Sequence, residues 1–140
     1  MNKDINIEIQ EAIEACDQVL NHMYASKKYI SSAKNWGIFD IIAGGLITSI
    51  IKRNKMSNAQ HEIDMAKSAL VNLKSELSDI SEIMDIDINV GIILDVSDIF
   101  FDNVFSDIIA QGKINRFRND LEHAIQKIEF IRDRLISYMN

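Results

Sequence analysis

Three aspartates in the second half of the chain have the spacing of a shared metal-binding face. Asp95, Asp98 and Asp102 stand at positions i, i+3 and i+7, which places them on one side of a helix. Carboxylate oxygens suit Mg²⁺ or Ca²⁺, with water completing the coordination shell. In the alternative interpretation, Asp95 caps a helix and the other two form a solvated or lysine-paired face. The metal site is therefore one of two open hypotheses.

A fourth carboxylate, Asp40, lies in an apolar segment between Trp36 and the glycine pair Gly44-Gly45. A buried carboxylate is costly unless it is paired, so Asp40 must contact a backbone group or a cation, or face a polar cavity. Each glycine costs about 1 kcal/mol relative to alanine inside a helix, which calls for a compensating close approach or a break in the helix. The segment is a candidate structural fixing point or ligand contact.

The same residues carry a resemblance to a family. The chain resembles an uncharacterised family of small bacterial helical proteins that share an A-x-N-W-G-x-x-D-x-x-G-G block and a downstream F-F-D block. Ala43 stands where the family pattern has a third glycine, and Phe100-Phe101-Asp102 matches the second block. The resemblance covers the middle half of the chain and names no chemistry. It implies one shared binding site made by Trp36, Asp40, Gly44, Gly45, Phe101 and Asp102.

Long amphipathic helices must position these residues. Three segments carry apolar residues at intervals of three, four and seven, which is the repeat of helices that pack along their whole length. The chain also has no proline, so few positions would interrupt a helix. The first stripe contains Ile9, Ile13, Cys16, Leu20, Met23 and Ile30, widened by Ala12, Val19 and Tyr24; the second contains Met56, Ile63, Leu70, Leu73, Leu77, Ile80 and Met84; the third contains Ile114, Phe117, Leu121, Ile125, Ile128, Ile131 and Leu135.

Helix boundaries follow from local signals. Ser57 and Gln60 form a capping-box pattern that predicts a helix start, and Asn35 and Gly37 suit the end of the preceding helix. We therefore expect one all-α domain over residues 1–140, an elongated bundle of three long helices with two shorter apolar helices at one end. The long helices are expected at about 5–34, 57–84 and 113–138, and the shorter ones at 36–52 and 91–111.

Composition and charge exclude several classes of protein. The net charge is −6 and no basic stripe carries interleaved aromatics, which disfavours nucleic-acid binding. Residues 18–61 carry six basic side chains against Asp40 alone, and residues 75–112 carry nine acidic side chains and no lysine or arginine, so the two regions are expected to lie together. The single cysteine, Cys16, excludes an internal disulfide and is expected to be a core residue of a cytoplasmic protein.

These observations favour a non-enzymatic, self-associating helical interaction module, because no catalytic set of residues accompanies the apolar stripes. A homo-oligomer and a protein partner are expected. One alternative is a small-ligand or divalent-metal binder that uses Asp40, Asp98 and Asp102. The other is a peripheral membrane protein, which the basic residues after the apolar run would support but which is not favoured over a buried helix.

Overall fold

The computed structural model describes residues 2–43, 46–84 and 114–139, and side chains within 5–31, 57–81 and 115–139. These ranges contain three helices and no strand: α1 spans Asn2–Ala43, α2 spans Leu46–Met84 and α5 spans Ile114–Ser137. The all-α prediction is confirmed for this part of the chain. The third predicted helix, 113–138, agrees with α5 to within one residue at each end.

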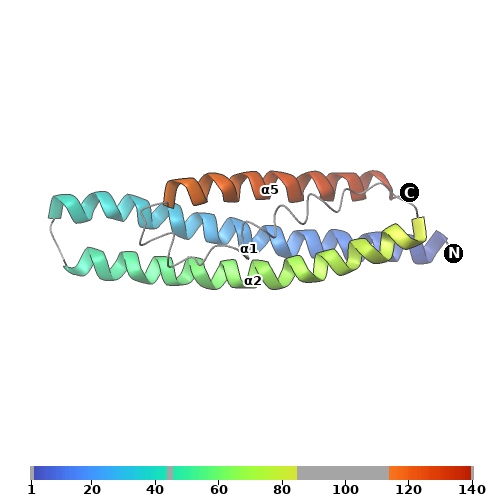
Figure 1. The fold of residues 1–140 in the computed structure, drawn as a ribbon, viewed down its shortest axis with the longest axis horizontal. Helices are drawn as coiled ribbons and strands as arrows, with labels where there is room; N and C mark the ends of the chain where they lie inside the picture. Colours follow the sequence, from blue (N-terminus) through green and yellow to red (C-terminus); the bar gives the residue numbers. More distant parts are fainter. Residues whose placement is uncertain (1, 44–45, 85–113, 140) are drawn as a thin grey trace.

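The three helices lie along a common long axis (Figure 1). Helices α1 and α2 form an antiparallel hairpin, and α5 lies antiparallel to α1 along its N-terminal half. The start of α1, the end of α2 and the end of α5 therefore share one end of the molecule, and the hairpin tip forms the other (Figure 1).

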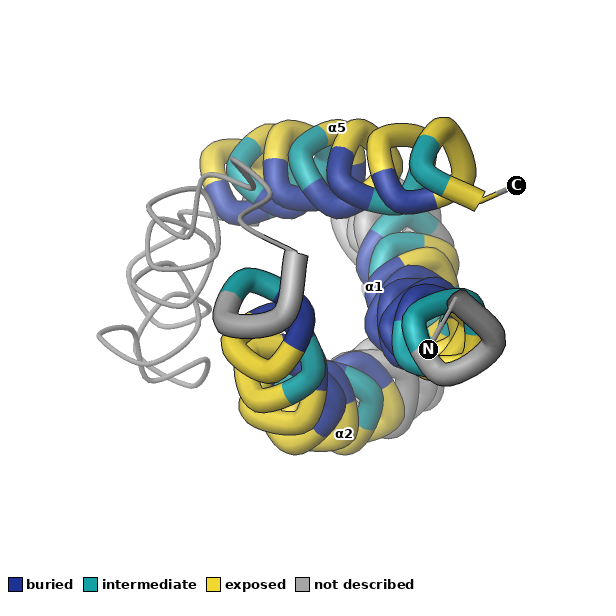
Figure 2. The backbone as a smooth tube through the Cα atoms, turned by 90° about the vertical axis from the view of Figure 1, so that its right-hand side faces the viewer, coloured by how far each residue is buried: buried dark blue, intermediate teal, exposed yellow. Residues whose placement is uncertain are grey.

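The core consists of the three apolar stripes that the sequence predicted. Figure 2 shows that the buried sides of α1, α2 and α5 face a common interior, while their exposed sides face outward. Every stripe residue with a described side chain, except Tyr24, is no more than 5% exposed. Each large side chain buried in this way contributes roughly 1.5–3 kcal/mol of transfer free energy. The described parts of the apolar stripes are thus buried within a single chain.

Small residues bring α1 and α2 close together. Ala15 on α1 and Ala59 and Ala66 on α2 are all buried, and short side chains at a helix interface let two backbones approach. The closeness is visible at Ser26, whose buried hydroxyl donates to the backbone carbonyl of Ala59 at 3.3 Å. This bond satisfies the one buried polar residue in the described core, which would otherwise carry a desolvation cost.

Two predicted boundaries are wrong. Helix α1 does not end near residue 34 but continues through Asn35 and Gly37 to Ala43, and α2 begins at Leu46 rather than at Ser57. The predicted short helix 36–52 is therefore divided between the end of α1 and the start of α2. A single glycine costs only about 1 kcal/mol, which neighbouring helical residues can offset, so isolated stop signals did not break the helix.

The predicted capping box at Ser57 is also wrong. Ser57 is an exposed residue inside α2, where backbone amides already have helical partners, so no cap is needed. Instead of reaching back, the Gln60 side chain donates to Asp64 Oδ1 one turn further on, at 2.9 Å.

Candidate functional site

The residues predicted for the partner-binding site are not brought together within the described side chains. Trp36 and Asp40 lie in the last turns of α1, at the hairpin tip, but their side chains lie outside the described set. Gly44 and Gly45 fall between α1 and α2, outside the described residues, as do Asp95, Asp98, Phe101 and Asp102. The predicted binding site, the Mg²⁺ or Ca²⁺ site and the helix at 91–111 therefore stay predictions.

A different set of polar side chains meets along the contact between α1 and α5. Arg132 Nε donates to Asp17 Oδ1 at 2.5 Å, and Lys27 Nζ lies 3.1 Å from Glu122 Oε1. Between these ion pairs, the hydroxyl of Tyr24 donates to Glu129 Oε1 at 2.9 Å. Positions rise along α1 as they fall along α5, so the three pairs fix the antiparallel register of the two helices.

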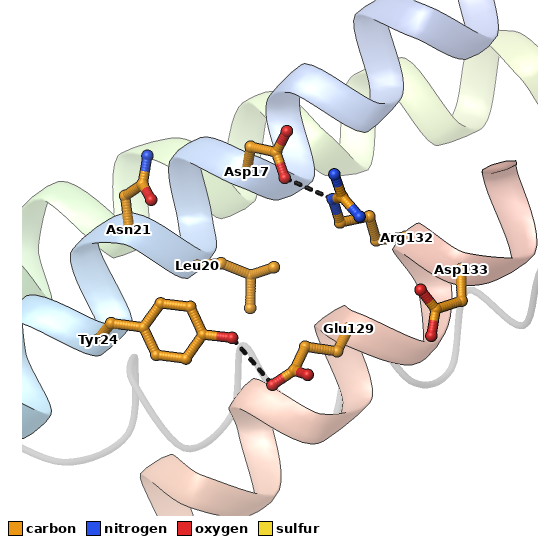
Figure 3. Close-up of a pocket in the computed structure, with 7 residues that line it drawn as sticks. All are labelled: Asp17, Leu20, Asn21, Tyr24, Glu129, Arg132 and Asp133. Carbon is orange, nitrogen blue, oxygen red and sulfur yellow. Dashed lines mark hydrogen bonds and ion pairs between the residues drawn. The ribbon is translucent and has the colours of Figure 1, made fainter.

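The close-up in Figure 3 shows how these side chains lie at one end of the contact. Asp17 and Tyr24 extend from α1 toward α5, and Glu129, Arg132 and Asp133 extend from α5 (Figure 3). The Asp133 carboxylate has no ion-pair partner among the described residues, whereas the Arg132 guanidinium is bound by Asp17. The charge of Asp133 nevertheless acts on the neighbouring Arg132.

Two hollows flank the bond between Tyr24 and Glu129. The first, of about 260 Å³, is lined by Asp17, Leu20, Asn21, Tyr24, Glu129, Arg132 and Asp133. The second, of about 320 Å³, is lined by Tyr24, Lys27, Glu122, Ile125, Gln126 and Glu129. The two hollows share Tyr24 and Glu129, and we refer to them together as the α1–α5 groove.

Two aromatic side chains, one on α1 and one on α5, are exposed to solvent. Tyr24 is 45% exposed, which corrects the expectation that it widens the apolar face of α1. Its hydroxyl donates to Glu129 at the edge of the contact between α1 and α5. This position suits a side chain with an apolar ring and a polar end. Phe130 is 56% exposed and lies one turn from Gln126 and one turn from Asp133, which both line the groove.

The groove perturbs two of its ionisable groups. The hydrogen bond and the charge of Asp17 raise the pKa of Arg132, so this guanidinium stays charged. Partial desolvation raises the pKa of Tyr24, and the hydrogen bond to Glu129 and the charge of that carboxylate act in the same direction. Tyr24 therefore keeps its proton and acts as a hydrogen-bond donor rather than as a base.

A sequence signal for the groove was present but is ambiguous by itself. Asp17, Asn21, Tyr24 and Lys27 recur at intervals of four, three and three residues, directly beside the buried stripe of α1. Such flanking positions often carry pairs that set helix orientation. The sequence does not say which helix supplies their partners, so the α5 residues could not be assigned.

Polar contacts also fix the register of α1 and α2. His22 Nδ1 lies 2.6 Å from Glu62 Oε2, with both side chains partly buried, and Ser26 bonds to Ala59 one turn along. A step of four residues along α1 is matched by a step of three back along α2. These contacts hold the hairpin together on the side away from the α1–α5 groove.

An acidic cluster lies near the shared end of α1 and α2. One carboxylate oxygen each from Glu8, Glu76 and Asp79 lies within 4.8 Å of the others. Burial, followed by the charges of Glu11, Glu8 and Asp79, raises the pKa of Glu76, whose buried Oε2 has no hydrogen-bond partner. The cluster was missed from the sequence because its members come from two helices, and its mutual repulsion favours a protonated Glu76.

Cys16 is a core residue, as expected. Its side chain is fully buried, and burial raises the pKa of the thiol to about 12, with Asp17 adding to the shift. A thiol that stays protonated is a poor nucleophile and a poor metal ligand.

Comparison of the chain with protein-family models, curated proteins and solved structures found no match in any of the three. The resemblance noted from the sequence therefore stays a prediction. In the described part of the chain, none of the helices has a stretch long and apolar enough to cross a membrane.

Proposed function

We propose that this chain is a non-enzymatic helical interaction module and that it binds a partner protein through the α1–α5 groove. The observation that carries the proposal is the depression itself, whose lining combines the exposed ring of Tyr24 with charged side chains from α1 and α5. Phe130, which is also exposed, lies one helical turn from the lining residues Gln126 and Asp133. Aromatic residues supply much of the binding energy at protein interfaces, and polar groups around them give orientation.

The groove is suited to binding rather than to chemistry. Its cations are engaged in ion pairs, and Tyr24 is a donor to Glu129, so these groups hold the two helices in place. Three interhelical pairs hold these side chains in place, and a surface whose side chains are already ordered loses less conformational entropy when a partner binds. The elongated arrangement of the helices would present this surface along several turns.

Self-association is the first form of partner binding to consider. The sequence favoured it because apolar stripes would need a second copy to cover them, but these stripes are buried within one chain. A homo-oligomer would therefore have to form through another surface, such as the groove. Binding of a small ligand or metal by Asp40, Asp98 and Asp102, and association with a membrane surface, stay alternative proposals that the groove does not favour.

Site-specific photocrosslinking in the cells that make the protein tests this proposal. Phe130 is replaced by benzoylphenylalanine, a conservative aromatic change at an exposed position, and crosslinked products are resolved by mass. Val71 is the matched control, because it is an apolar α2 residue that is 60% exposed and far from the groove lining. We expect a discrete product from position 130 and none from position 71.

Two outcomes would contradict the proposal. Equal crosslinking from both positions would mean that exposure alone drives capture. No product from position 130 under conditions where the chain is folded would mean that the groove has no partner. A product at twice the chain mass of 16.0 kDa would identify a second copy as the partner.

A further inference from the structure

Building on the proposed function, we infer that the partner of the α1–α5 groove is a basic amphipathic segment. Its cationic side chains lie against the carboxylates of the groove and its apolar side chains contact Tyr24 and Phe130. The inference rests on the charge of the groove, on the two hollows and on the exposure of the two aromatic residues, each of which restricts the partner's chemistry.

The charge of the groove is negative. Its lining residues include four acids, Asp17, Glu122, Glu129 and Asp133, against two bases, Lys27 and Arg132. Both bases already have acidic partners within the chain. Asp133 has no ion pair among the described residues, although its charge also acts on Arg132, and the bond from Tyr24 uses only one of the two oxygens of Glu129. These two carboxylates can accept further hydrogen bonds from a cation. A cationic side chain would be attracted to these carboxylates, whereas an anionic side chain would be repelled.

The first hollow fits a long cationic side chain. Glu129 and Asp133, one helical turn apart on α5, both line it, and the hydroxyl of Tyr24 meets the Glu129 carboxylate (Figure 3). An arginine side chain there has carboxylate acceptors on one side and an aromatic surface on the other, which are the two contacts that its planar guanidinium favours. Phe130, outside the hollow, supplies an apolar contact one turn from Asp133.

The same charges disfavour two other occupants. A second copy that presented its own groove would bring an excess of two negative charges onto an equally negative surface. A membrane rich in anionic lipids repels the groove for the same reason. A basic protein segment is the occupant that removes the excess charge and also covers the aromatic side chains.

Selection from a peptide library tests this inference without assuming a sequence. Sixteen-residue helical peptides with randomised faces are selected on the whole chain, and selected pools are compared with the starting pool. We expect enrichment of arginine and lysine together with aromatic or aliphatic residues one helical turn away. The affinity of the best peptide should fall several-fold as ionic strength rises from low to physiological.

Reversing the charge of single acidic residues shows whether the selected peptides bind in the groove. Asp133→Lys should weaken the best peptide about ten-fold or more, because it sets a cation against a cation. Asp64→Lys makes the same change at an exposed position of α2, which contributes no residue to the groove, and should alter the affinity less than about two-fold. Circular dichroism checks that both variants remain helical. If either variant fails to fold, the salt dependence of peptide binding to the unmodified chain still tests the inference.

Selection of acidic or neutral peptides, absence of any binding peptide, or equal effects of the two reversals would overturn the inference. Dimerisation through the groove in sedimentation experiments would overturn it as well, in favour of a second copy. Crosslinking from Phe130 to a partner whose bound segment is not basic would leave the proposed function standing while the inference on charge fails.

Discussion

Replacement of Leu73 by alanine tests the packing on which the groove depends. Leu73 is fully buried in the middle of the α2 stripe. The change removes three carbon atoms, worth about 0.8 kcal/mol each in transfer free energy, or about 2.4 kcal/mol. The cavity left behind adds to this loss, so we expect a decrease of about 2–5 kcal/mol in the free energy of unfolding.

Val71→Ala is the matched control, two residues away on the same helix. Val71 is 60% exposed, so the loss of two carbon atoms should cost no more than about 0.6 kcal/mol. Urea denaturation followed by helical circular dichroism measures both variants, provided that the slope with denaturant is unchanged. Costs that are equal, or a larger cost at Val71, would mean that α2 is rotated and that the stripe has been assigned to the wrong face.

Ile128→Ala should likewise cost about 2–5 kcal/mol in urea denaturation, because Ile128 is fully buried on α5; a change below about 0.5 kcal/mol would place α5 wrongly. Cys16 should resist thiol reagents until the chain unfolds, since its thiol has a pKa of about 12; rapid labelling of the native chain would contradict its burial. Because folding raises the pKa of Glu76 above its ordinary value of 4.5, the protonated side chain favours the folded state. This contribution to stability is fully present below about pH 4.5 and is lost as the pH rises through the raised pKa. Glu76→Gln should therefore increase stability at pH 7 and have no effect below about pH 4; equal effects at both pH values would rule out this linkage.

The apolar spacing predicted the helical class and the core well. Side chains at Leu73 and Ile128 had to be buried because the repeat places them on the same face as their neighbours over several turns. The exception, Tyr24, lies at the edge of its stripe, where the ring can contact the core while the hydroxyl reaches a polar partner. A periodic pattern identifies the centre of a buried face more reliably than its edges.

The boundaries and the site were harder to predict, for two physical reasons. A helix stop at Gly37 or a helix cap at Ser57 changes the free energy of the helix by only about 1 kcal/mol. The packing of a long helix contributes more, so α1 continues past Gly37 and α2 begins before Ser57. The groove depends on which helices are neighbours: Asp17 and Arg132 are far apart in the chain, and only the packing of α5 on α1 brings them together. Single-sequence patterns do not contain that pairing.

Hydrogen–deuterium exchange measured by mass spectrometry would locate the binding surface most directly. The chain is compared alone and in complex with the best basic peptide selected as above. The α1–α5 groove predicts slower exchange in residues 17–28 and 122–133 and unchanged exchange in residues 62–75 of α2. Protection confined to 62–75, or no protection in either groove segment at saturating peptide, would contradict the assignment of the groove as the partner-binding surface.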